Sequence, residues 1–528
     1  MEGYVLDGLR ASADEVVCGL GDVVVQLAEL VVRGLGTATL AGLEDGFAAG
    51  GRELLRSGVQ LVLDKQAEAE RRLPQVTGAD GIVRTCAERG HGRPVITEFG
   101  AVMIRRIGYR TREKGQPNLY IRDAVLNLPP GGYSWRLQEL VVRFAREVAY
   151  DTVRELVQAA TGVTIGKRQI EEIVAAAAAS VPGFYAGPGP AGPGQPGGEH
   201  EHREGAARLP LMLSADGKGV AMRPESRRKR TKAPGKRVKN FQNRAGTGEK
   251  GTKRIAQVAC VFDVIPQPRT PEAVMASHHG GAGQDPGPGK AGRQHKPAPK
   301  AVSRRYRVDI AADRAQTTRW LFDEGERRDP GHDRDWGVLV DGDNHQISLI
   351  EAEAARRGIT VTILIDLIHV LEYLWKAAWA FHEPRNPAIE TWTITQITAI
   401  LRGHAGQVID LIRQLADEHP PRGSEHEKNV TRVLGYLEAK RPYLDYPSAL
   451  KAGWPVATGV IEGACRHLVK DRMDITGARW TTNGAQAILW LRVIRANADH
   501  DTYWTHHLQQ QHQRNHLSRY QNTHALAS

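Results

Sequence analysis

Three aspartates follow stretches that are predicted to be β-strands: Asp216 after Leu211–Ala215, Asp341 after Val338–Val340, and Asp366 after Ile359–Ile365. Carboxyl ends of neighbouring parallel strands meet at one edge of a sheet, where acidic side chains repel one another unless cations neutralise them. Two such aspartates with a helix-borne glutamate suit two Mg²⁺ ions, which together activate a nucleophile and stabilise the leaving oxygen. The alternative for any single aspartate is the common role of capping a turn or a helix.

Glu462 is the candidate glutamate, and it lies in a stretch with helical periodicity that begins at Gly459. The apolar positions of this stretch are Val460, Ile461, Ala464 and Leu468. Glu462, Arg466 and Lys470 follow one another at four-residue spacing on another face. A carboxylate continued by two cations could hold a metal ion and the adjoining phosphates. The alternative is an exposed ion pair between residues four apart, which contributes only a few tenths of a kcal/mol.

The elements that must position these residues indicate an α/β fold. Two more strands are expected at Ile255–Ile265 and Tyr306–Ala311, and helices at Asp313–Glu326 and Ile350–Arg357. Three strands first, followed by helices that alternate with strands, is the order of a ribonuclease-H-like domain. The predicted fold is therefore an α/β ribonuclease-H-like catalytic domain with a helical insertion, preceded by a mainly α-helical DNA-binding region.

Changes in composition divide the chain into six segments. Residues 1–182 are expected to be mainly helical, apart from a β-hairpin within Pro94–Ile121, and residues 183–208 form a Gly/Pro-rich linker. The first part of the catalytic core spans residues 209–385, with an expanded Gly/Pro-rich loop at 266–300. A helical insertion at 386–452 precedes the last part of the core at 453–498, which carries Glu462. Residues 499–528 are rich in His and Gln and are expected to form a solvated tail.

A helix-turn-helix pattern lies near residues 150–177. Tyr150–Ala160 is amphipathic with Asp151 as the expected N-cap, Gly162 breaks the helix, and Lys167–Ala177 resumes the helical period. Lys167, Arg168 and Gln169 would then begin a recognition helix that reads DNA. The alternative is an ordinary helical hairpin, which is much commoner.

The charge of the chain is concentrated in one segment. The formal net charge is +11, and the pI is about 9.5. The segment Arg227–Arg254 contains one acidic residue, Glu249, and twelve basic residues: Arg227, Arg228, Lys229, Arg230, Lys232, Lys236, Arg237, Lys239, Arg244, Lys250, Lys253 and Arg254. Such a cluster on an otherwise balanced chain predicts contact with a polyanion such as DNA, because each neutralised phosphate releases counterions. The alternative is a solvated loop without a partner.

Composition excludes several classes of protein. A hydrophobic content of 41% excludes global disorder. The cysteines, Cys18, Cys86, Cys260 and Cys465, are far apart and form no CxxC pair, which argues against a disulfide scaffold or a zinc knuckle. No apolar run approaches the ~18 residues of a membrane span, and acidic residues interrupt the N-terminus where a signal peptide would be apolar. We therefore expect a soluble cytosolic protein.

Several stretches resemble the insertion-sequence transposases of the Kra group, which belong to the Mutator-like DDE transposases. They are LSADGKGV (213–220), WGVLVDGDNHQI (336–347), DLIHVLEYLWKAAW (366–379), KRPYLDYP (440–447) and GWPVATGVIEGACRHLVKDRMDITGARW (453–480). The resemblance covers most of residues 209–503 and, more loosely, the first half from about Arg71. The last stretch is long and specific, whereas the aspartate motifs alone would not be.

Carried over residue by residue, the resemblance implies that Asp216, Asp341 and Glu462 are the catalytic and metal-binding residues. Related superfamilies have a Cys or Asp three residues before a His, and here that motif is formed by Asp366 and His369. This implies accessory roles for both. Asp366 follows the more convincing predicted strand, so the preference for Asp341 as the second catalytic aspartate rests on the family pattern.

The function that the resemblance implies is DNA transposition by two-metal phosphoryl transfer, with two Mg²⁺ (or Mn²⁺) ions. The partners are double-stranded DNA, at transposon ends and at the target, and a second copy in a homo-dimer or larger complex on DNA, with no membrane. The location is the bacterial cytoplasm, at the nucleoid. Arg466 and Lys470 would position phosphates. Two alternatives stay open: a ribonuclease-H-like nuclease that cuts but does not join, and a non-enzymatic DNA-binding protein descended from a transposase.

Overall fold

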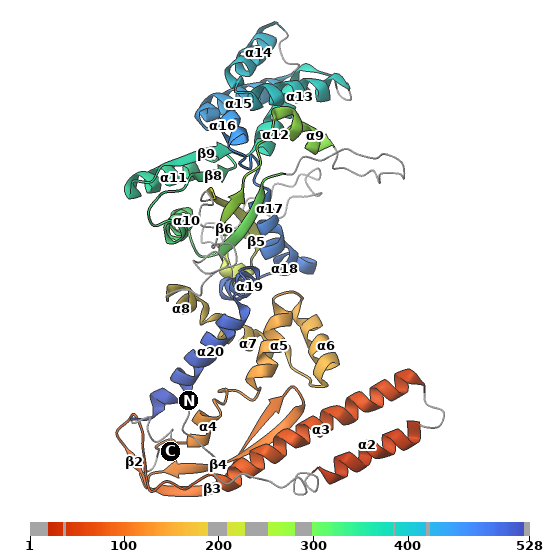
Figure 1. The fold of residues 1–528 in the computed structure, drawn as a ribbon, viewed down its shortest axis with the longest axis vertical. Coiled ribbons are helices and arrows are strands. Elements are labelled where there is room, and N and C mark those ends of the chain that lie inside the picture. The colour runs from red at the N-terminus through yellow and green to blue at the C-terminus, as the bar shows by residue number, and fades with distance from the viewer. Residues whose placement is uncertain are drawn as a thin grey trace. The chain divides into compact units, whose positions relative to one another are not determined.

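The computed structural model describes residues 20–34, 39–113, 115–187, 209–227, 252–279, 298–383, 386–418 and 423–521. The chain divides into two compact units, which are coloured along the sequence in Figure 1. Unit 1 consists of Met1–Gly189 together with Asp499–Ser528, and unit 2 consists of Pro190–Ala498. Among the described residues, no helix combines the length and the apolar composition needed to cross a membrane.

Unit 2 is built on a mixed sheet of five strands. The strands are β5 (Leu211–Ala221), β6 (Lys253–Ile265), β7 (Lys300–Asp309), β8 (Trp336–Val340) and β9 (Val361–Ile365). Their order in the sheet is β7-β6-β5-β8-β9. β6 is antiparallel to β5 and β7, whereas β5, β8 and β9 run parallel to one another. Every residue of β8 is buried, as expected of a parallel strand that is covered on both faces.

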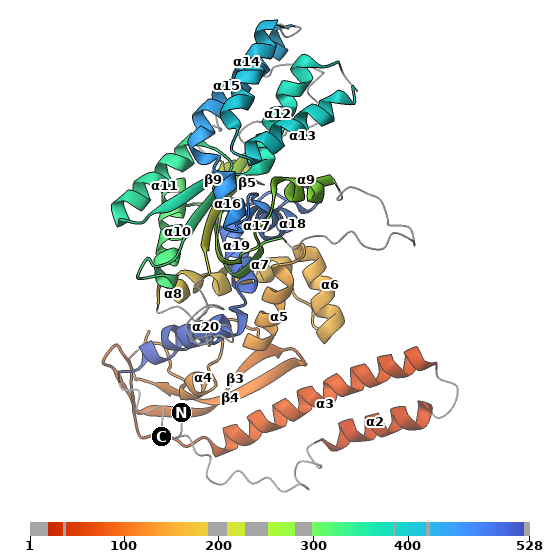
Figure 2. The ribbon, with the colours of Figure 1, turned by 45° about the horizontal axis from the view of Figure 1, so that its top comes forward.

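Helices cover both faces of this sheet (Figures 1 and 2). One side carries α10 (Arg314–Arg328) and α11 (Asn344–Arg357). The other carries α17 (Gly459–Ala464), a π-helical turn (Cys465–Lys470), α18 (Asp471–Met473) and α19 (Thr482–Ala496). Asp313 caps α10 in a capping box with Gln316, and Gly325 of the same helix makes room for the Trp336 ring of β8, 2.4 Å from where a Cβ would lie.

A helical block follows the last parallel strand. It comprises α12 (Leu367–Phe381), α13 (Ala388–Leu401), α14 (Ala405–Glu418), α15 (Ser424–Lys440) and α16 (Tyr446–Lys451), and α9 (Pro271–His279) packs against α13. The helices predicted between 386 and 440 are thus present, and they pack onto α12, which lies before the predicted start of the insertion.

Unit 1 contains a helical arm, a β-hairpin and a group of short helices. The arm consists of α2 (Gly21–Gly34) and α3 (Leu40–Ala69), and the small strands β1 (Val76–Thr77) and β2 (Val83–Arg84) follow. The hairpin pairs β3 (Cys86–Thr97) with β4 (Gly100–Arg110) and confirms the hairpin predicted in this region. Its helices are α4 (Ile121–Val125), α5 (Trp135–Ala145), α6 (Tyr150–Thr161), α7 (Lys167–Ala178), α8 (Val181–Ala186) and α20 (His500–Asn515).

Three predictions for unit 1 are wrong. Asp151 is not the N-cap of α6, because Ala149 occupies that position and Asp151 lies in the first turn. The linker does not begin at residue 183, because α8 continues to Ala186. The predicted solvated tail is instead helix α20, which buries Tyr503, Trp504, His507 and Gln511 within unit 1. These four residues recur on one helical face, so the polar composition concealed an amphipathic pattern.

Candidate active site

The three candidate aspartates lie at one level of the sheet. Ser214 of β5 is opposite Leu339 of β8, and Val340 of β8 is opposite Ile365 of β9. Continuing this register places Asp216 opposite Asp341 and Asp341 opposite Asp366. The row therefore crosses three adjacent strands at their carboxyl edge, where sites form in such sheets.

Asp216 does not end its strand, contrary to the prediction. β5 continues to Ala221, because its second half keeps pairing with β6, with Asp216 opposite Val258. The parallel pairing with β8 ends at Ser214, so Asp216 still lies beyond the parallel part of the sheet. The side chain is half-buried, and its Oδ2 accepts a hydrogen bond from Cys465 Sγ at 3.4 Å. Burial, together with the negative charge of Asp216, raises the pKa of the Cys465 thiol, which therefore stays protonated.

Asp341 is exposed and keeps one carboxylate oxygen without a described hydrogen bond. Its Oδ1 accepts from the backbone N–H of Asp343 at 2.9 Å. The next residue, Gly342, has φ +96°, and a Cβ there would lie 2.8 Å from the Tyr436 hydroxyl oxygen. That hydroxyl is 3.4 Å from the Asp341 carbonyl oxygen, to which it donates. A glycine is therefore required beside Asp341, both for the backbone turn and for the tyrosine.

Tyr436 is a residue of this site that sequence reasoning missed. Its ring stacks on Tyr373 with centroids 3.7 Å apart. Burial raises the pKa of the Tyr436 phenol, and the charges of Asp341 and Asp366 raise it further. Tyr436 belongs to α15, so the helical block supplies a side chain that contacts Asp341 of the aspartate row.

Asp366 is fully buried and caps α12. Its Oδ1 accepts from the backbone N–H of Ile368 at 2.9 Å, and its Oδ2 accepts from the hydroxyl of Thr458. Both oxygens are therefore engaged within the protein. The backbone around it is fixed as well, since Asp366 N–H donates to Val340 and Leu367 N–H donates to Val456, two residues before Thr458.

Thr458 connects the aspartate row to Glu462. Its buried hydroxyl oxygen lies 3.4 Å from Glu462 Oε1 while it donates to Asp366. Glu462 itself is exposed in the first turn of α17, and its backbone N–H donates to the Thr458 carbonyl at 3.0 Å. Sequence reasoning named Asp366 and Glu462 separately, and nothing in their spacing indicated the threonine between them.

His369 contacts a glutamate of its own helix, α12. Its Nδ1 is 3.8 Å from Glu372 Oε2, and the ring is half-buried. The pairing gives His369 no described link to the carboxylates of the row.

The helix after Glu462 changes to a π-helix between Cys465 and Lys470. The backbone N–H of Asp471 donates to Arg466, five residues earlier, as in π-helical turns. As expected from the sequence, Ile461, Ala464 and Leu468 are buried while Glu462, Arg466 and Lys470 are exposed. Arg466 approaches Asp471 at 3.9 Å, so its guanidinium is only weakly paired.

Buried Arg492 of α19 supports the π-helical turn. Its Nε donates to the Leu468 carbonyl at 2.9 Å, and its Nη2 donates to the His467 carbonyl. Carbonyl groups of a widened turn lack the backbone N–H donors that they usually have along a helix. The Arg492 guanidinium donates to two of these carbonyls in their place. The π-turn that follows Glu462 therefore depends on a residue from a later helix.

The predicted basic segment joins two paired strands at the same sheet edge. The last residue of β5, Ala221, is opposite the first residue of β6, Lys253. The connection therefore leaves the sheet five residues after Asp216. The structure describes Arg227, near the start of the segment, and Arg254, at its end. Arg254 Nη1 donates to Thr482 Oγ1 at 3.1 Å. The other predicted DNA-contacting residues of the segment lie outside them: Arg228, Lys229, Arg230, Lys236 and Arg237.

The two helices predicted on either side of Gly162 are present in unit 1 as α6 and α7, an arrangement shared by a helix-turn-helix and an ordinary helical hairpin. Gly162 ends α6 in the left-handed conformation at φ +74°, and α5 packs against both α6 and α7. Lys167, at the start of α7, pairs with Asp151 at 2.9 Å, and Arg168 pairs with Glu172 at 2.9 Å. Both basic side chains are exposed and Gln169 is half-buried. Exposed pairs of this kind contribute little stability, so both cations are available to a stronger anionic partner.

The carboxylates suit Mg²⁺ by their chemistry, because hard oxygen ligands are what this ion prefers. Among the described residues, no three His, Cys, Asp or Glu side chains converge closely enough to hold one ion. Mg²⁺ is usually bound by only one or two carboxylates, with water and substrate phosphates completing the shell. Asp216, Asp341 and Glu462 each carry oxygen ligands of this kind.

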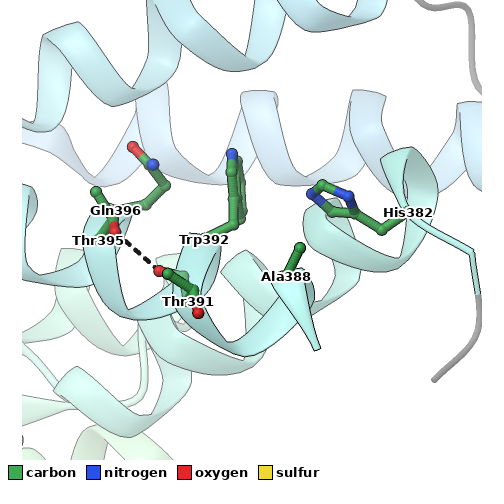
Figure 3. Close-up of a pocket in the computed structure, with 6 residues that line it drawn as sticks. All are labelled: His382, Ala388, Thr391, Trp392, Thr395 and Gln396. Atoms are coloured by element: carbon green, nitrogen blue, oxygen red, sulfur yellow. Dashed lines mark hydrogen bonds between the residues drawn. The ribbon is translucent and has the colours of Figure 1, made fainter. Parts of the chain in front are cut away.

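A separate cavity of about 400 Å³ lies in the helical block (Figure 3). It is lined by His382, Ala388, Thr391, Trp392, Thr395 and Gln396. None of these residues is acidic, and none belongs to the aspartate row. The cavity therefore adds nothing to the carboxylate site.

In comparisons with known proteins, no family model and no curated protein matches this chain.

Proposed function

We propose that this chain is a metal-dependent DNA transposase that cuts DNA at transposon ends and joins the freed 3′-OH to target DNA. The observation that carries the proposal is the row of Asp216, Asp341 and Asp366 across three adjacent strands, with Glu462 linked to that row through Thr458. Acidic side chains along one edge of a sheet repel one another, and cations bound there would relieve that repulsion.

The topology of unit 2 supports a ribonuclease-H-like fold in this proposal. The first three strands are antiparallel neighbours, and the next two join the other side of β5 in parallel after α10 and α11. Glu462 is supplied by a helix that follows the helical block, as in the Kra-group transposases that the sequence resembles. The protein would act in the cytoplasm, at the nucleoid.

Asp216, Asp341 and Glu462 would hold two Mg²⁺ (or Mn²⁺) ions. Such ions lower the pKa of water and neutralise the charge that develops on a phosphodiester. Asp341 is favoured over Asp366 as a ligand because it is exposed with a free oxygen, whereas both oxygens of buried Asp366 already accept hydrogen bonds. Asp366 then helps to position Glu462 by holding Thr458, whose backbone carbonyl accepts from the Glu462 N–H, and His369 stays an accessory residue.

Basic residues around the row would bind the DNA backbone. The connection between β5 and β6 carries most of the net charge and begins at the sheet edge that bears the aspartates. Arg466 and Lys470 extend from Glu462 along the exposed side of its helix. Phosphate contacts of this kind fix the position of a duplex without reading its sequence. Lys167, Arg168 and Gln169 of unit 1 are the proposed readers of the terminal repeats.

The proposal is tested with purified protein and duplex oligonucleotides that carry the ends flanking the gene. Asp216→Asn, Asp341→Asn and Glu462→Gln should each abolish Mg²⁺-dependent cleavage while leaving DNA binding and folding intact. Asp410→Asn, an exposed carboxylate on α14, is the matched control and should cleave normally.

The products separate the proposal from its alternatives. Cleavage with joined strand-transfer products supports a transposase, whereas cleavage without joining indicates a nuclease. End-specific binding without any cleavage would indicate a DNA-binding protein. An active Asp341→Asn variant together with an inactive Asp366→Asn variant would contradict the assignment of Asp341.

A further inference from the structure

Helix α3 presents an apolar stripe to solvent on the side opposite the hairpin. Leu40, Phe47, Leu55 and Val62 are 72%, 43%, 52% and 57% exposed. Val59 and Leu63, on the adjoining face of the helix, pack against the core of the hairpin. None of the residues of α3 is fully buried, although the helix has 30 residues. A stable helix of this length with its long apolar residues in water calls for a partner.

Exposed and half-buried positions form a continuous line along the helix, which we name the α3 seam: Leu40, Glu44, Phe47, Gly51, Leu55, Gly58, Val62 and Lys65. Successive members are three or four residues apart, so they stay on one face from end to end. Such a line is the pattern of a helix that pairs along its whole length.

The seam is complementary to itself when it is reversed. Around a point between Leu54 and Leu55, Glu44 is as far from the centre as Lys65, Phe47 as far as Val62, and Gly51 as far as Gly58. Two antiparallel copies would therefore place each Glu44 beside the Lys65 of the other helix, and each Phe47 beside a Val62. This is the relation required of a two-fold interface, in which residue i contacts j and j contacts i.

The glycines of the seam give an independent reason to expect a close neighbour. Glycine inside a helix is destabilising relative to alanine. A Cβ added at Gly51 or Gly58 would meet no atom within 4 Å. Nothing among the described residues therefore requires glycine at these positions, whereas a second helix that crosses closely would.

The net negative charge of α3 favours a protein over DNA as the partner of the α3 seam. Residues 40–69 contain five acidic and three basic side chains, although the whole chain has a net charge of +11. Within one copy, Lys65 pairs with Glu68 at 3.4 Å. Such a solvent-accessible pair is weak, so Glu44 of a second copy can replace Glu68 as the partner of Lys65.

The size of the surface fits a dimer. A 30-residue helix is about 45 Å long and roughly 10–12 Å wide, so α3 offers about 500 Å². Two copies would bury about 1,000 Å² in total, the size at which specific interfaces begin.

We propose that the α3 seam pairs with the α3 seam of a second copy of this chain, antiparallel about a two-fold axis between Leu54 and Leu55. The resulting contact joins two arms, each of two helices, with the two copies of α3 at its centre and the two copies of α2 at its opposite ends. The dimer forms without DNA and does not depend on the catalytic role of unit 2.

Light scattering and sedimentation of the full chain without DNA test this proposal. The wild-type chain should be a dimer at micromolar concentration. Glu44→Lys and Lys65→Glu should each raise the dimer Kd about tenfold, since each dimer contains two such pairs, and the double variant should restore the wild-type value. Asp45→Lys, the same change at the neighbouring exposed position outside the seam, is the control and should leave the dimer unchanged.

Gly58→Leu provides a second test that does not involve charge. Because a Cβ at Gly58 meets open space within the chain, the variant should fold with unchanged helicity and yet dissociate into monomers. A monomeric wild-type chain would overturn the proposal. So would a dimer that tolerates Glu44→Lys or Gly58→Leu, or a double charge reversal that fails to restore the dimer.

Discussion

Replacing Thr458 with valine removes one hydroxyl from the centre of the candidate site and keeps the shape of the side chain. In the native protein this hydroxyl donates to Asp366 Oδ2 and lies 3.4 Å from Glu462 Oε1. Asp366 is fully buried, so no water can take the place of the lost donor. We expect the Thr458→Val variant to lose stability and, within the proposed function, to lose control over the position of Glu462.

The magnitude follows from the hydrogen bonds of this hydroxyl. A hydrogen bond to a charged group contributes about 1.5–3 kcal/mol, and a buried acceptor left without a donor costs a similar amount. We therefore expect a loss of about 2–3 kcal/mol. Because unit 2 spans Pro190–Ala498, that corresponds to a fall of roughly 3–5 °C in its unfolding temperature.

The assay combines calorimetry with cleavage as a function of Mg²⁺ concentration. Thr458→Ser is the matched control because it keeps the hydroxyl and loses only a methyl group, so it should remain within about 1 kcal/mol of the wild type. The valine variant should also need more Mg²⁺ for half-maximal cleavage, and the serine variant should not. Equal unfolding temperatures for the two variants would refute the reasoning about Asp366.

Three further predictions concern burial, the π-helical turn and the basic segment. His507 is buried with Nδ1 3.0 Å from Ser180 Oγ, and burial lowers its pKa from 6.5 to about 4. The unfolded chain binds that proton more tightly, so about 3 kcal/mol of stability present above pH 6.5 should be lost as the pH falls towards 4. Chemical unfolding across this range should show a flatter profile for His507→Gln. Arg492→Met should destabilise unit 2 by about 2–5 kcal/mol, because two buried carbonyls lose their donor, whereas Arg495→Met at an exposed position of the same helix should change the unfolding temperature little. Neutralising the basic residues between 227 and 254 should weaken DNA binding in a filter or anisotropy titration. The slope of log K against log salt should fall by about 0.9 for each phosphate that the variant no longer neutralises, with end preference unchanged.

The sequence predicted the elements of unit 2 well where burial on both faces makes strands continuously apolar. The strands that precede Asp341 and Asp366 are examples, and each ends within one residue of the predicted position. The predicted end of β5 at Ala215 was wrong, because the strand continues past Asp216 by pairing with β6. Pairing with a strand far along the chain leaves no mark on local hydrophobicity.

The candidate site was predicted only in part, because its connections are made by residues with no distinctive spacing. Tyr436 reaches the aspartate row from α15, whereas Thr458 and Cys465 reach Asp366 and Asp216 from the two ends of α17. Single threonines, tyrosines and cysteines are common enough that only the assembled fold shows their roles. The π-helical turn was equally hidden, because its support comes from Arg492, more than twenty residues later.

The division of unit 1 between the two ends of the chain has a consequence for synthesis on the ribosome. Helix α20 supplies Tyr503, Trp504 and His507 to the core of unit 1, but it is translated after the whole of unit 2. At about 5–20 residues per second, the roughly 300 intervening residues take about 15–60 s to make. During that interval the residues that α20 will cover are open to water and to chaperones, while unit 2 has all of its own sequence before α20 emerges. Unit 1 thus begins to appear first and is completed last.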